Sequence, residues 1–368
     1  MPTVKNRLKL RVAKNISSLV PYPPGKPIEE LERELGISGS IKLASNENPL
    51  GPSKKAVKAV AGALTNLHRY PDGSCYYLKT RLAVFLKMPP ETLIFGNGSN
   101  EIIELLVRAY LSKGDEAVMG DPSFAVYPIA VKAAGAKPVT VALKGFTHDL
   151  AAMARAITAK TRVVFIANPN NPTGTMVGRT EFDRFMRDVP EDVIVCVDEA
   201  YAEFVRNPDF PDAFGYVRSG RAALVLRTFS KIYGLAGLRV GYGAAPAEMI
   251  DYMNRVRQPF NVNSLAQVAA IAALDDRKHL ERTLENNAAG LEYLFREVKA
   301  MGLEAVPTEA NFFLIRVNDG KKVYDGLLRK GVIVRPMASY GLPEFIRVTV
   351  GLPKENKRFV KALAEVIR

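Results

Sequence analysis

The chain has 368 residues, of which 48% are hydrophobic and 24% charged, and its formal net charge is +13. This balance is typical of a folded protein and excludes a disordered chain. No apolar run approaches the roughly 18 residues that a membrane span needs, so we expect no membrane-spanning segment.

The basic residues are spread along the chain rather than gathered in one block, which suits anionic small-molecule ligands better than nucleic acid. The three histidines and two cysteines show no metal-ligand or redox spacing. We therefore expect no metal site and a reducing, cytoplasmic compartment.

Residues 1–40 are predicted to form an N-terminal arm. The proline-rich segment 20–27 cannot be the interior of a helix or strand. Residues 28–35 then show the pattern of a short amphipathic helix that ends at Gly36.

Apolar runs that end in glycine or polar residues follow along the chain and predict buried strands of a parallel sheet. The runs are 93–96, 116–119, 162–167, 193–197 and 222–226.

The first run ends in Gly96 and Gly98, after which Ser99 or Asn100 is predicted to cap a helix over 101–110. Free N–H groups at a helix N-terminus, with the helix dipole behind them, bind anions. Helix capping without a ligand explains the same pattern.

Two later runs end in polar residues that could bind a ligand. The segment 168–174, Asn-Pro-Asn-Asn-Pro-Thr-Gly, is a tight turn of strong turn-formers. Asp198 ends a buried strand, where a carboxylate is costly unless it meets a cation. Nucleotide hydrolases also carry an Asp-Glu pair there, but the chain has no Gly-x-x-x-x-Gly-Lys loop.

The segment 228–239 carries a lysine beside a buried strand. At Lys231 burial and a nearby cation favour the neutral, nucleophilic amine. Thr228, Ser230 and Arg239 supply the donors that a phosphate needs. A solvated lysine at the exit of a strand is the simpler alternative.

The last hundred residues show three short strands, 310–317, 332–336 and 345–351, which alternate with amphipathic helices. Arg347 interrupts the apolar pattern of the third strand. A buried arginine indicates either an internal ion pair or a bidentate site for an acidic ligand.

Ser230 and Lys231, followed by Gly237, Leu238 and Arg239, resemble the cofactor-lysine segment of the class I and II aminotransferases. These are pyridoxal-phosphate enzymes of fold type I, and residues 168–174 match their Asn-Pro-Thr-Gly motif. Segments 260–264 and 335–343 are most similar to the histidinol-phosphate aminotransferases.

The resemblance implies an α/β fold whose large domain has a mostly parallel seven-stranded sheet between helices, with a smaller α+β domain. The implied boundaries are 1–40 for the arm, 41–265 for the large domain and 266–368 for the small domain.

The resemblance also implies the site. Lys231 would hold pyridoxal 5'-phosphate covalently and move a proton on the substrate, with Asp198 at the ring nitrogen and Tyr201 at the ring oxygen O3′. The other implied cofactor contacts are Tyr70, Ser99, Asn100, Phe124, Asn171, Thr228, Ser230 and Arg239. The implied substrate contacts are Tyr22, Asn46, Arg335 and Arg347.

The implied activity is amino transfer between histidinol phosphate and 2-oxoglutarate in histidine biosynthesis, by a homodimer in which Tyr70 reaches the neighbouring subunit's cofactor. An aromatic amino-acid aminotransferase or a phosphothreonine decarboxylase of the same fold remains an alternative. A transcription factor with an aminotransferase-like domain needs a winged helix first, and we expect 40 residues to be too few for one.

Overall fold

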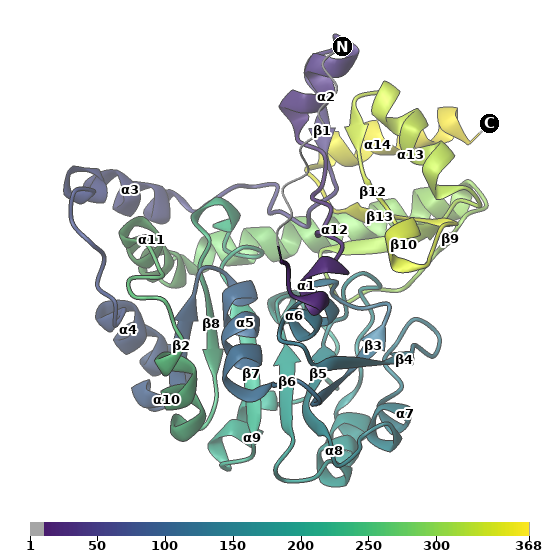
Figure 1. Cartoon of the computed structure of the whole chain (residues 1–368). Coiled ribbons are helices and arrows are strands. Elements are labelled where there is room, and N and C mark those ends of the chain that lie inside the picture. Colours follow the sequence, from purple (N-terminus) through teal and green to yellow (C-terminus); the bar gives the residue numbers. More distant parts are fainter. Residues whose placement is uncertain (1–10, 368) are drawn as a thin grey trace.

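The computed structural model describes residues 11–367, which form a larger and a smaller domain (Figure 1). The long helix α12 (Arg277–Ala300) joins them, because Leu280 near its start packs on the core of the larger domain and Leu294 belongs to the core of the smaller one. Among the described residues, no helix combines the length and apolar character that crossing a membrane requires.

A seven-stranded sheet forms the centre of the larger domain, in the order β2-β8-β7-β6-β5-β3-β4. Its strands are β2 (Leu93–Gly96), β3 (Glu116–Asp121), β4 (Lys137–Ala142), β5 (Thr161–Ala167), β6 (Ile194–Asp198), β7 (Ala223–Thr228) and β8 (Gly241–Ala244). β8 runs antiparallel to both of its neighbours, β2 and β7, whereas the pairs β7-β6, β6-β5, β5-β3 and β3-β4 are parallel. The predicted mostly parallel seven-stranded sheet is confirmed.

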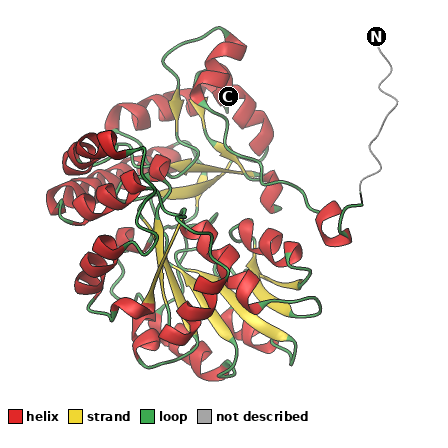
Figure 2. Ribbon diagram, turned by 60° about the vertical axis from the view of Figure 1, so that its left-hand side comes forward, coloured by secondary structure: helices red, strands yellow, loops and turns green. Residues whose placement is uncertain are grey.

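Both faces of this sheet are buried, which explains why its strands are continuous apolar runs. Successive residues alternate between two cores: Phe165 packs into one, and Val164 and Ile166 into the other. On the Phe165 side lie α5 (Ser99–Tyr110), α6 (Val126–Ala133) and α10 (Ala247–Arg255). On the other side lie α3 (Lys54–Ala63), α4 (Tyr76–Leu86), α7 (Leu150–Arg155), α8 (Arg179–Asp188), α9 (Ala213–Arg218) and α11 (Ser264–Leu274). Figure 2 shows the strands of the sheet between these helices.

The smaller domain contains an antiparallel sheet in the order β12-β13-β10-β9. Its strands are β9 (Glu304–Ala305), β10 (Phe312–Arg316), β12 (Arg335–Pro336) and β13 (Phe345–Thr349). A separate parallel pair joins β1 (Ile41–Lys42) to β11 (Val332–Ile333). The domain's core also includes residues of α12, α13 (Gly320–Arg329) and α14 (Pro353–Val366).

The arm contacts both domains. In α1 (Lys14–Ser17), Asn15 donates to the backbone of α6, and Leu31 of α2 (Ile28–Leu35) packs with Ile333 of the smaller domain. The predicted helix over 28–35 is confirmed, with Gly36 ending it at a φ of 65°. Residues 1–10 of the predicted arm lie outside the described residues.

The predicted strand 332–336 is wrong in one respect, because it is two strands of different sheets. Ile333 pairs with Lys42, whereas Arg335 pairs with Arg347, and the buried Val334 lies between them. A continuous apolar run shows that both segments are buried but not which strand each one pairs with.

The cores suggest domain boundaries that differ from 41 and 265. Ala266 and Ala273 of α11 belong to the core beneath the large sheet, whereas Ile41 pairs with Val332 of the smaller domain. We propose that the smaller domain takes in the residues around β1 and that the larger domain continues to Asp275, between α11 and α12.

Candidate active site

A cavity of about 600 Å³ lies where the carboxyl ends of the central strands meet the smaller domain. Ligands of open α/β sheets bind in this kind of crevice. Every predicted site residue other than Tyr70 lines it.

One end of the cavity is built to hold an anion. Ser99 and Asn100 lie in the first turn of α5, where unpaired N–H groups and the helix dipole attract negative charge. Thr228 and Ser230 follow β7, and the Ser230 N–H donates to the Thr228 hydroxyl at 3.1 Å. Arg239 adds a guanidinium to the same wall.

The capping prediction at this helix is wrong. Gly98 is the N-cap, at a φ of 78°, and Ser99 is already helical. L side chains rarely adopt this φ, and a Cβ at Gly98 would lie 2.5 Å from Arg239 Nη2, so a larger residue would be strained and would displace the guanidinium. The N-cap is therefore a glycine because of the backbone conformation and the nearby guanidinium, and no side chain caps this helix.

At the end of β6, Asp198 is buried, with 6% of its surface exposed. Its Oδ2 accepts from Tyr127 Oη at 2.7 Å and its Oδ1 from the Ala200 N–H at 3.1 Å. Burial raises the pKa of Asp198, while these hydrogen bonds and the charge of Lys231 lower it. A cationic ring nitrogen in the cavity would compensate this carboxylate.

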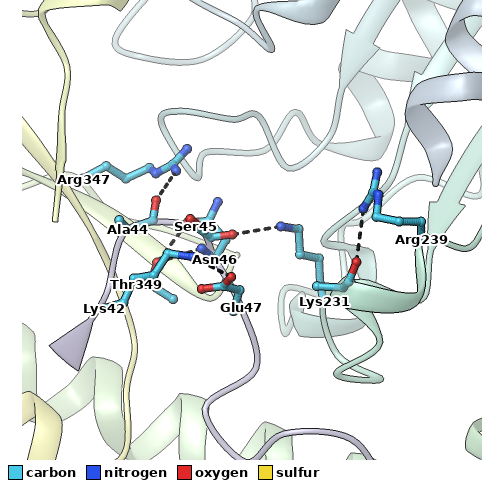
Figure 3. Close-up of polar contacts among 10 residues, drawn as sticks. Lys42, Ala44, Ser45, Asn46, Glu47, Lys231, Arg239, Arg347 and Thr349 are labelled. Carbon is cyan, nitrogen blue, oxygen red and sulfur yellow. Dashed lines mark hydrogen bonds and ion pairs between the residues drawn. The ribbon is translucent and has the colours of Figure 1, made fainter. Parts of the chain in front are cut away.

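The amine of Lys231 points into the cavity and donates to the Ser45 carbonyl at 3.1 Å (Figure 3). Burial, with the positive charges of Arg347 and Arg239, lowers its pKa to about 8 against the opposing effect of Glu47. A larger fraction of this amine than of an ordinary lysine is therefore neutral and nucleophilic near neutral pH.

Arg347 lies on β13, an inner strand of the small sheet, and is 5% exposed. Its Nη1 donates to Asn171 Oδ1 and its Nη2 to the Ala44 carbonyl at 2.8 Å, as Figure 3 shows for Ala44. Its Nε is buried without a partner among the described residues. No carboxylate pairs with Arg347 among those residues, which favours an anionic ligand over the internal ion pair that the sequence left open.

Arg335 lies directly across from Arg347 on β12 and is 7% exposed. Its Nη2 donates to the Pro23 carbonyl at 2.8 Å, and its guanidinium lies 5.6 Å from the centre of the Tyr22 ring. Like charges directly opposite one another destabilise a sheet. Two buried cations in this arrangement therefore indicate a site for a strongly anionic group.

Asn46 and Tyr201 form a hydrogen-bonded part of the cavity wall. Asn46 Nδ2 donates to Tyr201 Oη at 2.9 Å, and its Oδ1 accepts from Thr349 at 3.1 Å. Burial raises the pKa of Tyr201 to about 12, so its hydroxyl stays protonated and can donate to a ligand.

The asparagines of the 168–174 turn differ in role. Asn168 bonds the backbone of Val177, and Asn170 bonds Ser123 and Thr173. These hydrogen bonds hold the turn together and tie it to Ser123. Asn171 lines the cavity and, with its oxygen held by Arg347, keeps its amide nitrogen for a ligand.

The structure does not bring Tyr70 to the cavity of its own chain. Its side chain is 82% exposed and stacks on Phe260 at 4.8 Å. Any contact between Tyr70 and a cofactor must therefore involve a second copy of the chain.

These groups fit pyridoxal 5'-phosphate. The anion end suits a phosphate, the acid of Asp198 suits a ring nitrogen, and the amine of Lys231 suits an aldehyde carbon. The Phe124 ring, on the cavity wall, suits stacking on an aromatic face. No group of His, Cys, Asp or Glu within residues 11–367 is placed to hold a metal ion.

A family model described as aminotransferase class I and II matches residues 38–363. The chain belongs to this family.

Curated relatives support the assignment at high similarity. The histidinol-phosphate aminotransferase of Moorella thermoacetica is 52% identical over 354 residues, covering 96% of this chain and 92% of the relative. Histidinol-phosphate aminotransferase 1 of Nitrosococcus oceani is 49% identical over 356 residues, covering 96% of both chains.

Solved structures of the family share the fold. Histidinol-phosphate aminotransferase from Sinorhizobium meliloti, in complex with pyridoxal-5'-phosphate, superposes with a TM-score of 0.89 at 27% identity, covering 97% of this chain and 98% of that one. The Thermus thermophilus aspartate aminotransferase with maleate has a TM-score of 0.84 at 23% identity, covering 97% and 100%, and so shares the fold.

Tyr127 and Glu47 are among the residues of the cavity wall that sequence reasoning missed. Tyr127, which holds Asp198, follows Phe124 by three positions, and an aromatic pair at that spacing was its only local signal. Glu47 lines the cavity and pairs with Lys42 at 2.8 Å, and nothing in the polar turn around it indicates this position.

Proposed function

We propose that this aminotransferase transfers an amino group between L-histidinol phosphate and 2-oxoglutarate, with pyridoxal 5'-phosphate as its cofactor. The observation that carries the choice of substrate is the pair of buried arginines, Arg335 and Arg347, opposite Lys231 in one cavity. A phosphate ester carries more negative charge than a carboxylate and uses more donors. The histidinol-phosphate aminotransferases among the relatives add support at about 50% identity.

When bound, the cofactor supplies an electron sink for the bond that breaks at the substrate's Cα. Lys231 would hold the cofactor through its amine and, as a neutral amine, would take a proton from the substrate's Cα. Asp198 keeps the ring nitrogen protonated through its negative charge. Asn171 and Tyr201 donate to the ring oxygen O3′.

The remaining residues bind and orient. The backbone N–H groups of Ser99 and Asn100 hold the cofactor phosphate, with Thr228, Ser230 and Arg239. Phe124 covers one face of the ring. Arg347 binds the anionic group of each substrate in turn, with Asn46 beside it, and Arg335 and Tyr22 add contacts to the larger phosphate.

The working unit in this proposal is a homodimer in the cytoplasm. Tyr70 is exposed beside Phe260, and a second copy would bring its Tyr70 to this cavity's phosphate end. Two further aromatic residues, Tyr76 and Tyr77 at the start of α4, are also exposed, and a partner would cover apolar surface of this kind. Both cysteines, Cys75 and Cys196, are free, as expected in a reducing compartment.

A panel of half-reactions tests the substrate. The cofactor-loaded protein is mixed with histidinol phosphate, phenylalanine, tyrosine, glutamate or phosphothreonine while the cofactor's absorbance is followed. Histidinol phosphate is expected to react with a higher kcat/KM than phenylalanine, tyrosine or phosphothreonine. Faster reaction with phenylalanine would favour an aromatic aminotransferase, and release of CO₂ from phosphothreonine would favour a decarboxylase.

A further inference from the structure

Tyr127 makes the shortest hydrogen bond to Asp198, although it lies on a different element. It is in the first turn of α6 and is 0% exposed. Its Oη donates to Asp198 Oδ2 at 2.7 Å, and its ring stacks on Phe165 with centroids 4.7 Å apart and planes 12° from parallel. The stack fixes the ring, so the position of the hydroxyl is fixed as well.

This bond determines how the carboxylate is presented. A carboxylate accepts about four hydrogen bonds, and Asp198 receives one on each oxygen, from Tyr127 and from the Ala200 N–H. Rotation of the carboxylate is thereby restricted, while lone pairs remain for a donor in the cavity. The bond also opposes the rise in the pKa of Asp198 that burial causes, which favours the charged form.

The same side chain contacts the aromatic wall. The Tyr127 ring meets the Phe124 ring edge to face, with centroids 5.5 Å apart at 84°. Phe124 lines the cavity, so one buried tyrosine contacts both the acid and the stacking surface.

We propose that Tyr127 is a positioning residue for the cofactor ring, holding the Asp198 carboxylate in its charged form and aimed at the ring nitrogen. The inference rests on the proposed function, since it requires pyridoxal phosphate in this cavity. Tyr127 acts through Asp198 and takes no part in moving protons on the substrate.

The test compares two ligands on the cofactor-free protein: pyridoxal phosphate and its analogue in which carbon replaces the ring nitrogen. Dissociation constants are measured by absorbance and fluorescence, without turnover. A hydrogen bond to a charged group is worth about tenfold or more in affinity. The parent protein should therefore prefer pyridoxal phosphate by about tenfold or more.

Tyr127→Phe keeps the ring and removes the hydroxyl. Its preference for pyridoxal phosphate over the analogue should fall by about threefold or more, with analogue affinity nearly unchanged. Tyr216→Phe is the matched control, because it removes another Tyr–Asp hydrogen bond of 2.8 Å, to Asp183, on a residue that does not line the cavity. It should leave both affinities unchanged.

The outcomes separate the two claims. If the parent protein does not discriminate between the ligands, the role of Asp198 in the proposed function fails. If the parent discriminates and Tyr127→Phe discriminates equally well, the role of Tyr127 is overturned while the proposed function stands.

A second pair of variants guards against poor folding of Tyr127→Phe, which leaves a buried charge short of a donor. In the Asp198→Asn background that charge is absent, so adding Tyr127→Phe should change pyridoxal phosphate affinity by less than about twofold. If Tyr127→Phe lowers pyridoxal phosphate affinity as much in the Asp198→Asn background as in the parent protein, Tyr127 acts through another group and the inference is overturned.

Discussion

Replacing Arg335 by glutamine should separate the phosphate-ester substrate from its rivals. Glutamine keeps a neutral donor that reaches toward the Pro23 carbonyl, which accepts from Arg335 at 2.8 Å, but it removes the charge. The structure therefore predicts a loss confined to ligands that use the second cation of the cavity.

The size of the effect follows from the charge that is lost. A charge-assisted hydrogen bond contributes about 1.5–3 kcal/mol, and about 1.4 kcal/mol corresponds to a factor of ten. The value of kcat/KM for histidinol phosphate should thus fall by about 10- to 100-fold. That for phenylalanine should fall by less than about threefold, because Arg347 alone serves its carboxylate.

The assay is the single-turnover half-reaction, followed by cofactor absorbance over a range of substrate concentrations. Arg316→Gln is the matched control: Arg316 lies on β10 of the same sheet but pairs with Glu304 at 3.1 Å and does not line the cavity. Its half-reactions should match the parent. Equal losses for both substrates in Arg335→Gln would refute the assignment of Arg335 to the phosphate ester.

Three further predictions concern the reacting groups. Asp198→Asn should lower kcat by about 100-fold or more, the usual scale for a preorganised charge, and near-normal turnover would assign the role elsewhere. Mixing inactive Tyr70→Ala and Lys231→Ala proteins should restore activity through heterodimers with one intact site, and no recovery after verified subunit exchange would count against a shared site. Covalent uptake of pyridoxal phosphate needs the neutral Lys231 amine, so its rate should rise with pH and level off above about 8, the lowered pKa of that amine. Arg347→Met should move this midpoint upward and Glu47→Gln downward, since the first removes a positive and the second a negative charge; stopped-flow absorbance measures both, and an unmoved midpoint would contradict the electrostatics.

Features that depend on a few consecutive residues could be predicted from the sequence. Asp198 and Lys231 each follow an apolar run, and such a run determines where the buried strand ends and a polar side chain emerges. The turn that carries Asn171 was recognisable because its residue types allow few other conformations. These local signals pointed to Asp198, Lys231 and the turn, whereas the family resemblance supplied the other candidate site residues and their roles.

Features that depend on pairing between distant segments could not be predicted from the sequence. Tyr127 and Asp198 are 71 positions apart, and nothing local to either one announces their hydrogen bond. The register that sets Arg335 against Arg347 is likewise a property of the folded sheet.

Asp198 and Glu199, the two acids at the end of β6, also combine a predictable feature with one that only the fold determines. Asp198 faces the cavity, but Glu199 turns away and forms a buried ion pair with Arg227 at 2.6 Å. Strand alternation predicts that the two acids point to opposite sides. Which of them finds an internal cation depends on β7, the neighbouring strand.

The most direct test of the proposed active site is to find which lysine holds the cofactor. The protein loaded with pyridoxal phosphate is reduced with borohydride, digested and mapped by mass spectrometry, with Lys231→Ala treated in parallel. We expect the label on Lys231 alone, and Lys231→Ala to bind the cofactor without becoming labelled. Stoichiometric label on any other lysine of the parent protein would contradict the assignment of this cavity as the active site.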